Sequence, residues 1–244
     1  MPYDFIDIGC SKGGSLAWGA ANFGGTGLGI DLDERKVQAT LAAGHHAIVA
    51  DARHLDLPDN AVRFATLSDV LEHMPDGEIA EKCLAEAYRV ASEFVLVRGP
   101  NFDRGDYLAK NALKKYFADW RGHTWHHQTE DFVRLAQRVG AREVLLLSHE
   151  RIHSSEHPDI LPASAPQDQG RYDPAAHGPK PFITFGRKIY SRIVMVLGKV
   201  PEANLQRIAL TACSGRVVNF MPATGGPAEV SGYSSPRSKG PHEA

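Results

Sequence analysis

The 244-residue sequence has only three cysteines, Cys10, Cys83 and Cys213, and none of them form a Cys-x-x-Cys pair. An odd number of widely separated thiols excludes a disulfide scaffold and a zinc ribbon, and it fits a reducing compartment. No apolar run reaches the roughly 18 residues of a membrane-spanning helix. The first residues also lack the basic-then-apolar pattern of a signal peptide. We therefore expect a soluble, cytoplasmic protein.

Charge of either sign is not in excess. The chain has 27 Lys and Arg against 29 Asp and Glu, which gives a formal net charge of -2. This balance argues against a protein whose main role is to bind nucleic acid or an anionic membrane. With 43% hydrophobic residues, the chain can bury a substantial core without a disulfide or metal.

Short apolar runs alternate with helical patterns through most of the chain. Strands are expected at 5–8, 28–32, 47–50, 64–67, 94–97, 144–147 and 189–197, and helices at 14–22, 34–43, 76–92, 106–120, 129–139 and 201–213. Runs that are almost entirely apolar are typical of strands covered on both faces. Strand–helix alternation predicts a parallel sheet with right-handed crossovers.

Glycines and polar residues follow four of these strands, at the sheet edge where open α/β sheets bind ligands. The first strand leads into Asp7-Ile8-Gly9-Cys10-Ser11-Lys12-Gly13-Gly14, a turn that allows close approach of a ligand to the backbone. Asp31-Leu32 ends the second strand, Asp51-Ala52 the third, and Ser68-Asp69-Val70 the fourth. Each feature alone also fits a structural role, such as a packing glycine, a loop carboxylate or a helix N-cap at Asp31. Their joint occurrence favours a cofactor site.

Together these motifs resemble those of class I S-adenosylmethionine-dependent methyltransferases, in the group with an Asp-x-Gly-Cys motif and a Leu-Glu-His-x-x-Asp segment, here Leu71 to Asp76. The resemblance covers about residues 4–150 and the strand at 189–197. It implies an α/β fold: a Rossmann-like, doubly wound, mostly parallel seven-stranded sheet with an antiparallel last strand and helices on both faces. It also implies S-adenosyl-L-methionine as the cofactor.

The resemblance assigns cofactor-binding positions residue by residue. The methionine part would lie against Asp7, Gly9, Cys10, Ser11 and Gly13, the ribose against Asp31 and Leu32, the adenine against Asp51 and Ala52, and the sulfonium side against Ser68, Asp69 and Val70. One departure is Ser11, which stands where the family usually has glycine.

Two other functions remain as alternatives. A dinucleotide-dependent oxidoreductase would need Gly-x-Gly-x-x-Gly, but the sequence from Gly9 is Gly-Cys-Ser-Lys-Gly-Gly and lacks the second glycine that admits a pyrophosphate. The other alternative is a non-catalytic partner protein with a methyltransferase fold. It is motivated by Ser11 and by the lack of an obvious general base.

Histidines supply the only candidates for catalysis. Methyl transfer from a sulfonium mainly requires orientation of the nucleophile and exclusion of water. His73, after the fourth strand, and His127, before a helix with a predicted Thr129 N-cap, are weak candidates for a base, and both also fit as loop residues. The i, i+4, i+8 series at 149, 153 and 157 continues a strand without supporting cysteines, so no metal site is expected.

The remaining segments predict the domain organisation. We expect one methyltransferase domain over residues 1–221, with lid-like insertions at 101–125 and at the proline-rich 154–181, and a disordered tail over 222–244. Helices before the first strand usually roof the cofactor in the resembling family, and here that strand is expected within five residues of the start. We expect the two insertions, or a second subunit of a homo-oligomer, to replace that roof.

The first insertion also indicates the acceptor. Segment 101–125 is rich in aromatic and basic residues, which as a lid would suit a small or medium acceptor with a phosphate or carboxylate, such as a sugar-linked metabolite. Core packing of the aromatics and solvation of the charges are the alternative explanation. No nucleic-acid partner is expected.

Overall fold

The computed structural model describes residues 2–213 and 220–222. Its strands are β1 (Phe5–Ile8), β2 (Gly27–Asp31), β3 (His46–Val49), β4 (Val62–Ser68), β5 (Ala91–Pro100), β6 (Leu113–Lys115), β7 (Glu143–Ser154), β8 (Ile160–Pro162), β9 (Thr184–Gly198) and β10 (Phe220–Pro222). Eight of them form one sheet in the order β10-β7-β9-β5-β4-β1-β2-β3, and β6 pairs with β8 in a second, two-stranded sheet.

The helices lie between the strands, as the alternating pattern predicts. They are α1 (Gly14–Phe23), α2 (Glu34–Ala42), α3 (Gly77–Val90), α4 (Gly105–Lys110), α5 (Thr129–Arg138), α6 (Pro174–His177) and α7 (Glu202–Ala212), with 3-10 turns η1 (Leu71–His73) and η2 (Tyr116–Asp119). None of these described helices is long and apolar enough to cross a membrane.

The direction of the strands brings the predicted cofactor motifs together. Strands β1 to β5 are parallel, so the loops after them meet at one edge of the sheet. Strand β9 lies between β5 and β7 and is antiparallel to both. This arrangement confirms the mostly parallel sheet with an antiparallel last strand, and the short β10 adds an eighth strand beside β7.

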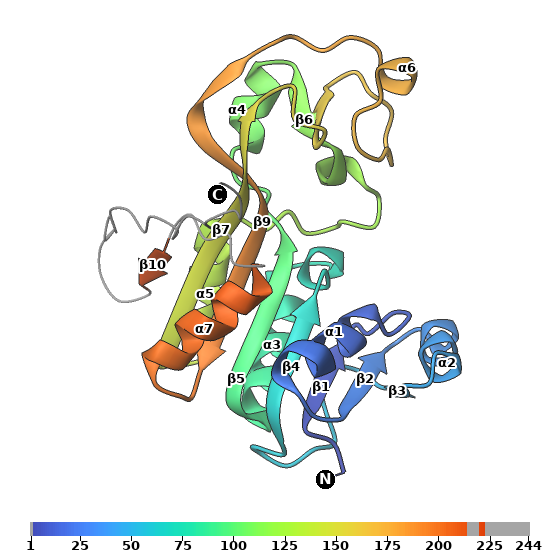
Figure 1. Cartoon of the computed structure of the whole chain (residues 1–244), viewed down its shortest axis with the longest axis vertical. Coiled ribbons are helices and arrows are strands. Elements are labelled where there is room, and N and C mark those ends of the chain that lie inside the picture. Colours follow the sequence, from blue (N-terminus) through green and yellow to red (C-terminus); the bar gives the residue numbers. More distant parts are fainter. Residues whose placement is uncertain (1, 214–219, 223–244) are drawn as a thin grey trace, which may run out of the picture.

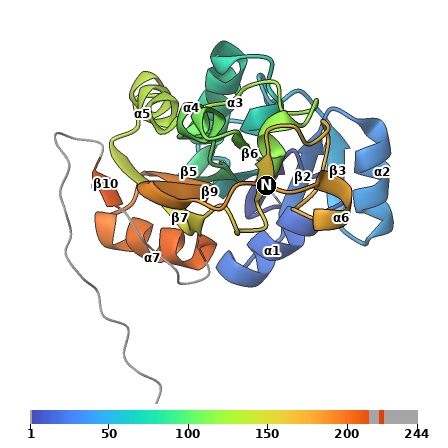
Figure 2. The ribbon, with the colours of Figure 1, turned by 90° about the horizontal axis from the view of Figure 1, so that it is seen from above.

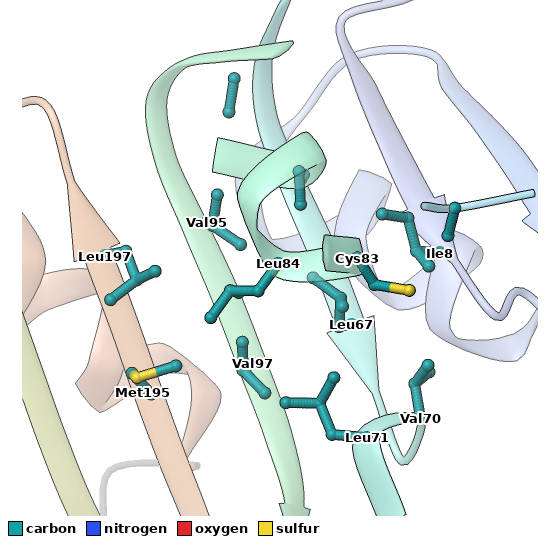
Figure 3. Packing of buried hydrophobic residues seen from close by; sticks show 14 of the residues in the cluster. Ile8, Leu67, Val70, Leu71, Cys83, Leu84, Val95, Val97, Met195 and Leu197 are labelled. Carbon is teal, nitrogen blue, oxygen red and sulfur yellow. The ribbon is translucent and has the colours of Figure 1, made fainter. Parts of the chain in front are cut away.

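Helices cover both faces of the sheet (Figure 2). On one face α3 and α5 bury residues such as Leu84 and Phe132 against the centre of the sheet. On the other face α1 and α7 contribute Leu16 and Leu205 to a separate core. Figure 3 shows the first of these cores, where side chains of α3 pack on β4 and β5. Burial of both faces explains why these strands are almost entirely apolar.

The helix predicted at 106–120 is wrong. Helix α4 ends at Lys110, Ala112 has a positive φ of 55°, and the chain then forms β6 and η2. Tertiary contacts outweigh the helical pattern because Leu113–Lys115 pairs with β8. The ammonium of Lys115 is buried and donates to the backbone carbonyls of Asn101, Asp103 and Tyr190, and burial lowers its pKa to about 7.

The start of α5 also differs from its prediction. Gln128, rather than Thr129, is the N-cap, in a capping box with Asp131. The hydroxyl and amide of Thr129 both donate to the carboxylate of Asp103, which ties the start of α5 to the loop after β5. Asp76 is the N-cap of α3, and its Oδ1 accepts from the amides of Glu78 and Ile79 at 2.9 Å.

The two predicted insertions lie together above the sheet, and we call the elements within 101–125 and 154–181 the insertion layer (Figure 1). Strand β6 from the first insertion pairs with β8 from the second. The indole of Trp120 donates to the carbonyl of Gln169 at 2.6 Å, and Arg121 pairs with Asp168. A small core joins the layer to β7 and β9. It consists of Leu108, Leu113 and Ile160 of the layer and of Ile152, Phe185 and Ile189 of the two strands.

Strands β7 and β9 carry the insertion layer. Both are longer than predicted, because they continue beyond the main sheet and remain paired as far as Ser154 and Thr184. Residues 223–244 of the predicted tail lie outside the described residues. Pro222, the first residue of that predicted tail, lies in β10.

Candidate functional site

The glycine-rich turn after β1 has the backbone conformations that its sequence suggests. Gly9 and Gly13 have φ angles of 71° and 86°. A Cβ on Gly9 would lie only 2.5 Å from Cγ2 of Val70, so the loops after β1 and β4 pack directly on each other. Ser11 has a φ of 51°, in the left-handed region that favours glycine, which explains why glycine is usual at this position.

Asp31 organises the turn from the neighbouring strand. Its Oδ2 accepts from the amide of Ser11 at 3.1 Å, and its Oδ1 accepts from the amide of Asp33 at 3.0 Å. The N-cap of α2 is Asp33, so the alternative role of Asp31 as that cap is wrong. The side chain of Leu32 is 69% exposed beside Asp31 and presents an apolar surface.

Asp7 lies below the turn and is completely buried. Its two carboxylate oxygens accept from the hydroxyls of Ser15 on α1, at 2.5 Å, and Thr66 on β4, at 2.6 Å. Burial raises the pKa of Asp7 to about 6, although both hydrogen bonds oppose the shift. Asp7 therefore ties β1, α1 and β4 together beneath the predicted methionine site.

Cys10 and Ala52 line the same edge as buried apolar residues. Cys10 packs with Val37 and Ala47 between the turn and α2, and Ala52 belongs to the core under β4. The carboxylate of Asp51 is held by Arg53, whose Nε donates to both oxygens at 2.9 Å.

The loop after β4 joins the cofactor positions to two arginines that the sequence reasoning missed. Ser68 Oγ accepts from Nε and Nη2 of Arg98 on β5, at 3.2 and 3.0 Å. Asp69, with a φ of 54°, pairs with Arg192 of β9 at 2.8 Å. A cation inside an otherwise apolar strand is the sequence signal that could have identified both arginines.

Arg98 is half-buried against α1. Its guanidinium lies 3.7 Å from the ring centroid of Trp18 on α1, and burial lowers its pKa. No carboxylate among the described residues forms an ion pair with it. The charge of Asp7 acts on Arg98, whereas the charge of Arg192 acts on Glu72. Arg98 therefore lies toward the cofactor positions, and Arg192 lies toward Glu72.

Beyond this loop, η1 and residues 122–127 bring several titratable side chains together. Glu72 and His127 are each only 1% exposed. The Oε2 atom of Glu72 and both ring nitrogens of His127 have no hydrogen-bond partner among the described residues. A Cβ on Gly99 would lie 3.5 Å from Glu72 Oε2 and 3.9 Å from His127 Nε2, so both atoms flank the same point of β5.

Burial controls the protonation of these groups. It raises the pKa of Glu72 to about 8 and lowers the pKa of His127 to about 4. The imidazole of His127 is therefore neutral at pH 7 and can accept a proton, but as a weak base. His73, the other predicted base, is exposed, and its Nδ1 lies 2.7 Å from the carbonyl of Gly122.

Aromatic rings surround the histidines of this loop. The ring of Phe102 stacks on that of His126 with centroids 4.6 Å apart, and it makes edge-to-face contacts with the rings of His123 and His127. Trp125 and Phe132 pack against His127. These aromatic residues help to bury His123 and His127, whereas His126 is exposed.

Most basic residues of the first insertion have structural partners. Lys115 is bound by three carbonyls, Lys114 donates to Asp119 and to the carbonyl of Ala165, and Arg121 pairs with Asp168. These cations hold the insertion layer together, so they do not form the anion-binding lid surface that the sequence suggested. The histidines at 149 and 153 lie on β7, where His149 is the strand partner of Arg192.

Comparison with known proteins identifies the domain at this edge of the sheet. Residues 6–93 match the family model of a methyltransferase domain. This segment contains all of the predicted cofactor positions. No curated protein sequence matches the chain.

Solved structures share the fold over most of the chain. One is an S-adenosylmethionine-dependent methyltransferase from Archaeoglobus fulgidus, with a TM-score of 0.56 and 17% identity over 80% of this chain and 85% of that one. Another, from Thermotoga maritima, has a TM-score of 0.53 and 18% identity over 81% and 83%. A third, from Methanosarcina mazei, has a TM-score of 0.52 and 15% identity over 82% and 93%. At these identities the likeness concerns the fold.

Proposed function

We propose that this S-adenosylmethionine-dependent methyltransferase acts on a small or medium anionic acceptor, and that Arg192 binds the acceptor's carboxylate or phosphate. The chain carries a class I methyltransferase domain, and S-adenosyl-L-methionine is its cofactor. Sugar-linked metabolites with an acidic group fall within the proposed acceptor class.

The pair of arginines at the end of the sheet is the observation that carries the proposal. Arg98 and Arg192 lie close enough for Arg192 to lower the pKa of Arg98, and Asp69 is the one carboxylate described in contact with them. Two guanidinium groups with one direct carboxylate partner among the described residues retain donors for an anionic ligand. Arg98 would take the carboxylate of the cofactor, because it lies toward Asp7, and Arg192 would take the acceptor.

The predicted cofactor positions support the same arrangement. Asp31 is placed to accept hydrogen bonds from a ribose diol, and Leu32 presents an exposed apolar side chain next to it. The turn Gly9–Gly13 would lie against the methionine part, and the loop Ser68–Val70 against the sulfonium. The insertion layer would serve as the lid over the cofactor and the acceptor, either alone or together with a second subunit of a homo-oligomer.

The acceptor is tested by a labelled-methyl screen over metabolite pools separated by charge. We expect label from S-adenosylmethionine to enter compounds of the anionic pool. Label that enters only neutral or cationic compounds, or a macromolecule, would contradict the proposed acceptor class.

The two arginines provide a matched pair of variants. Arg192→Gln should raise the KM for the acceptor by about 10-fold or more, with little change in cofactor affinity, because an ion pair to a bound anion is lost. Arg98→Gln should weaken the cofactor instead. If Arg192→Gln changes only the cofactor affinity, the assignment of Arg192 to the acceptor is wrong.

A cytoplasmic location stays a prediction. It is supported by the three cysteines, which are all buried and unpaired, as expected in a reducing compartment.

A further inference from the structure

Three side chains at the end of β4 are arranged like the protein ligands of a metal ion. Glu72, His73 and His123 each offer one ligand atom, and the three atoms lie within 4.8 Å of one another. Glu72 and His73 come from η1, whereas His123 comes from the first insertion. The cluster therefore joins the methyltransferase sheet to the insertion layer.

In both imidazoles Nδ1 is held by a backbone carbonyl. Nδ1 of His73 lies 2.7 Å from the carbonyl of Gly122, and Nδ1 of His123 lies 2.8 Å from the carbonyl of Phe117. With Nδ1–H donated to a carbonyl in each ring, Nε2 keeps its lone pair. A backbone carbonyl on the second nitrogen is the common outer-shell partner of a metal-bound histidine, because it fixes the tautomer and the ring orientation.

Glu72 provides an independent observation. Its side chain is almost completely buried, and Oε2 has no hydrogen-bond partner among the described residues. A buried carboxyl oxygen without a hydrogen-bond partner is costly, since it has lost its hydrogen bonds to water. A cation bound directly to this oxygen would remove that cost.

We propose that Glu72, His73 and His123 bind one divalent first-row transition-metal ion, with Zn²⁺ as the first choice. Two imidazoles and one carboxylate form a donor set that suits Zn²⁺ and neighbouring ions, whereas Mg²⁺ and Ca²⁺ prefer oxygen ligands throughout. The sequence predicted no metal site here. Glu72 and His73 are adjacent, but His123 comes 50 residues after His73, and this spacing follows no known metal-binding motif.

The site closes by a small movement. Ligand atoms about 2.0–2.2 Å from a tetrahedral ion lie roughly 3.3 Å apart, so the cluster must contract by about 1.5 Å at most. His73 is exposed, so its ring can shift with less change in packing than the buried His123. Three protein ligands leave a fourth position open, as in catalytic rather than structural zinc sites. That this position receives an oxygen of the acceptor rests on the proposed function.

Metal binding is tested on the untagged full chain after removal of metal with a chelator. Zn²⁺ affinity is measured by competition with a chromogenic chelator, and Co²⁺ serves as a probe through the visible absorption of the bound ion. We expect one ion per chain. Glu72→Gln, His73→Gln and His123→Gln should each weaken binding by at least about 10-fold, because each removes a ligand.

His126→Gln is the matched control. His126 lies in the same loop and stacks on Phe102, but it is outside the cluster, so its variant should bind the ion like the native protein. Cofactor calorimetry and thermal unfolding show whether each variant is folded. His123 is buried, so its variant can fail to fold. His73 is exposed, so His73→Gln should fold and still tests the metal site in that case.

Two results would overturn the metal site. One is a native protein that binds neither Zn²⁺ nor Co²⁺ stoichiometrically. The other is a set of ligand variants that bind the ion as tightly as His126→Gln. Neither measurement of ion binding depends on methyl transfer. A chain that binds and uses S-adenosylmethionine but no metal ion would contradict the metal site alone. A chain that binds the ion but does not methylate an anionic acceptor would contradict the proposed function alone.

Discussion

The two halves of the site differ in how their polar groups are satisfied. On the cofactor side, which comprises the loops after β1 to β4, Asp7 and Asp31 accept hydrogen bonds from residues of neighbouring elements. On the proposed acceptor side, which comprises Glu72, His73, His123, His127 and Arg192, buried atoms of Glu72 and His127 lack partners among the described residues. The cofactor side is thus preorganised by the sheet, whereas the acceptor side has capacity to bind a further group.

The difference follows from where the residues come from. The cofactor side consists of short loops whose position is set by parallel strands on either side. The acceptor side depends on residues from η1, the first insertion and β9, which are distant in the sequence. We therefore expect substitutions on the two sides to have separable effects.

The largest expected effect is on the cofactor side. Gly9→Val should lower the affinity for the cofactor by about 100-fold or more. A Cβ at this position would lie 2.5 Å from Cγ2 of Val70, and the φ of 71° at Gly9 is strained for any residue with a side chain. Isothermal calorimetry with S-adenosylmethionine and its demethylated product measures this. The control is Gly14→Ala, since no atom lies within 4 Å of a Cβ at Gly14. Equal affinity of both variants would contradict the close contact between the two loops.

The second prediction concerns the insertion layer. Lys115→Met should lower the free energy of unfolding by about 3 kcal/mol, because three buried carbonyls lose their donor. Urea unfolding measures the loss, and limited proteolysis shows whether it is confined to the insertion layer. Lys110→Met, at an exposed position, should change stability by less than about 0.5 kcal/mol. Cofactor binding lost together with stability would show that the two sides are coupled.

The third prediction is a pH dependence that arises on the cofactor side. The pKa of Asp7 is about 6 in the folded chain and near 3.8 when it is exposed, so the folded state binds more protons between these values. Asp7 should therefore destabilise the protein increasingly as pH rises from about 4 to 6, by about 3 kcal/mol at most.

Unfolding free energies of the native chain and of Asp7→Asn, measured across this pH range, test the effect. The difference between the two proteins should change with pH in this range and be constant above it. A difference that does not change with pH would mean that Asp7 has an ordinary pKa.

The smallest expected effect is at the position that departs from the family pattern. Ser11→Gly should stabilise the protein by up to about 1 kcal/mol, because glycine adopts a φ of 51° without strain. Ser11→Ala, which keeps the Cβ, should give no gain in thermal unfolding. A gain in both variants would point to the serine hydroxyl rather than to the backbone.

Much of the fold could be predicted because it is local. The strands up to β5 and the helices α1, α2, α3 and α5 follow from apolar runs and helical periodicity over a few residues. The motifs after β1 to β4 could be placed at one edge, since parallel strands bring their carboxyl ends together. The segment 106–120 failed as a helix because the pairing of β6 with β8, 45 or more residues away, outweighed a local pattern.

By itself, the sequence determined the sheet, its direction and the cofactor edge, because alternating strands and helices leave few ways to bury both faces of a parallel sheet. Only the tertiary structure decided the acceptor side. It brought Arg192 of β9 beside Asp69, and it brought His123 of the first insertion beside Glu72 and His73. Such contacts depend on long-range packing, which no local pattern of residues records.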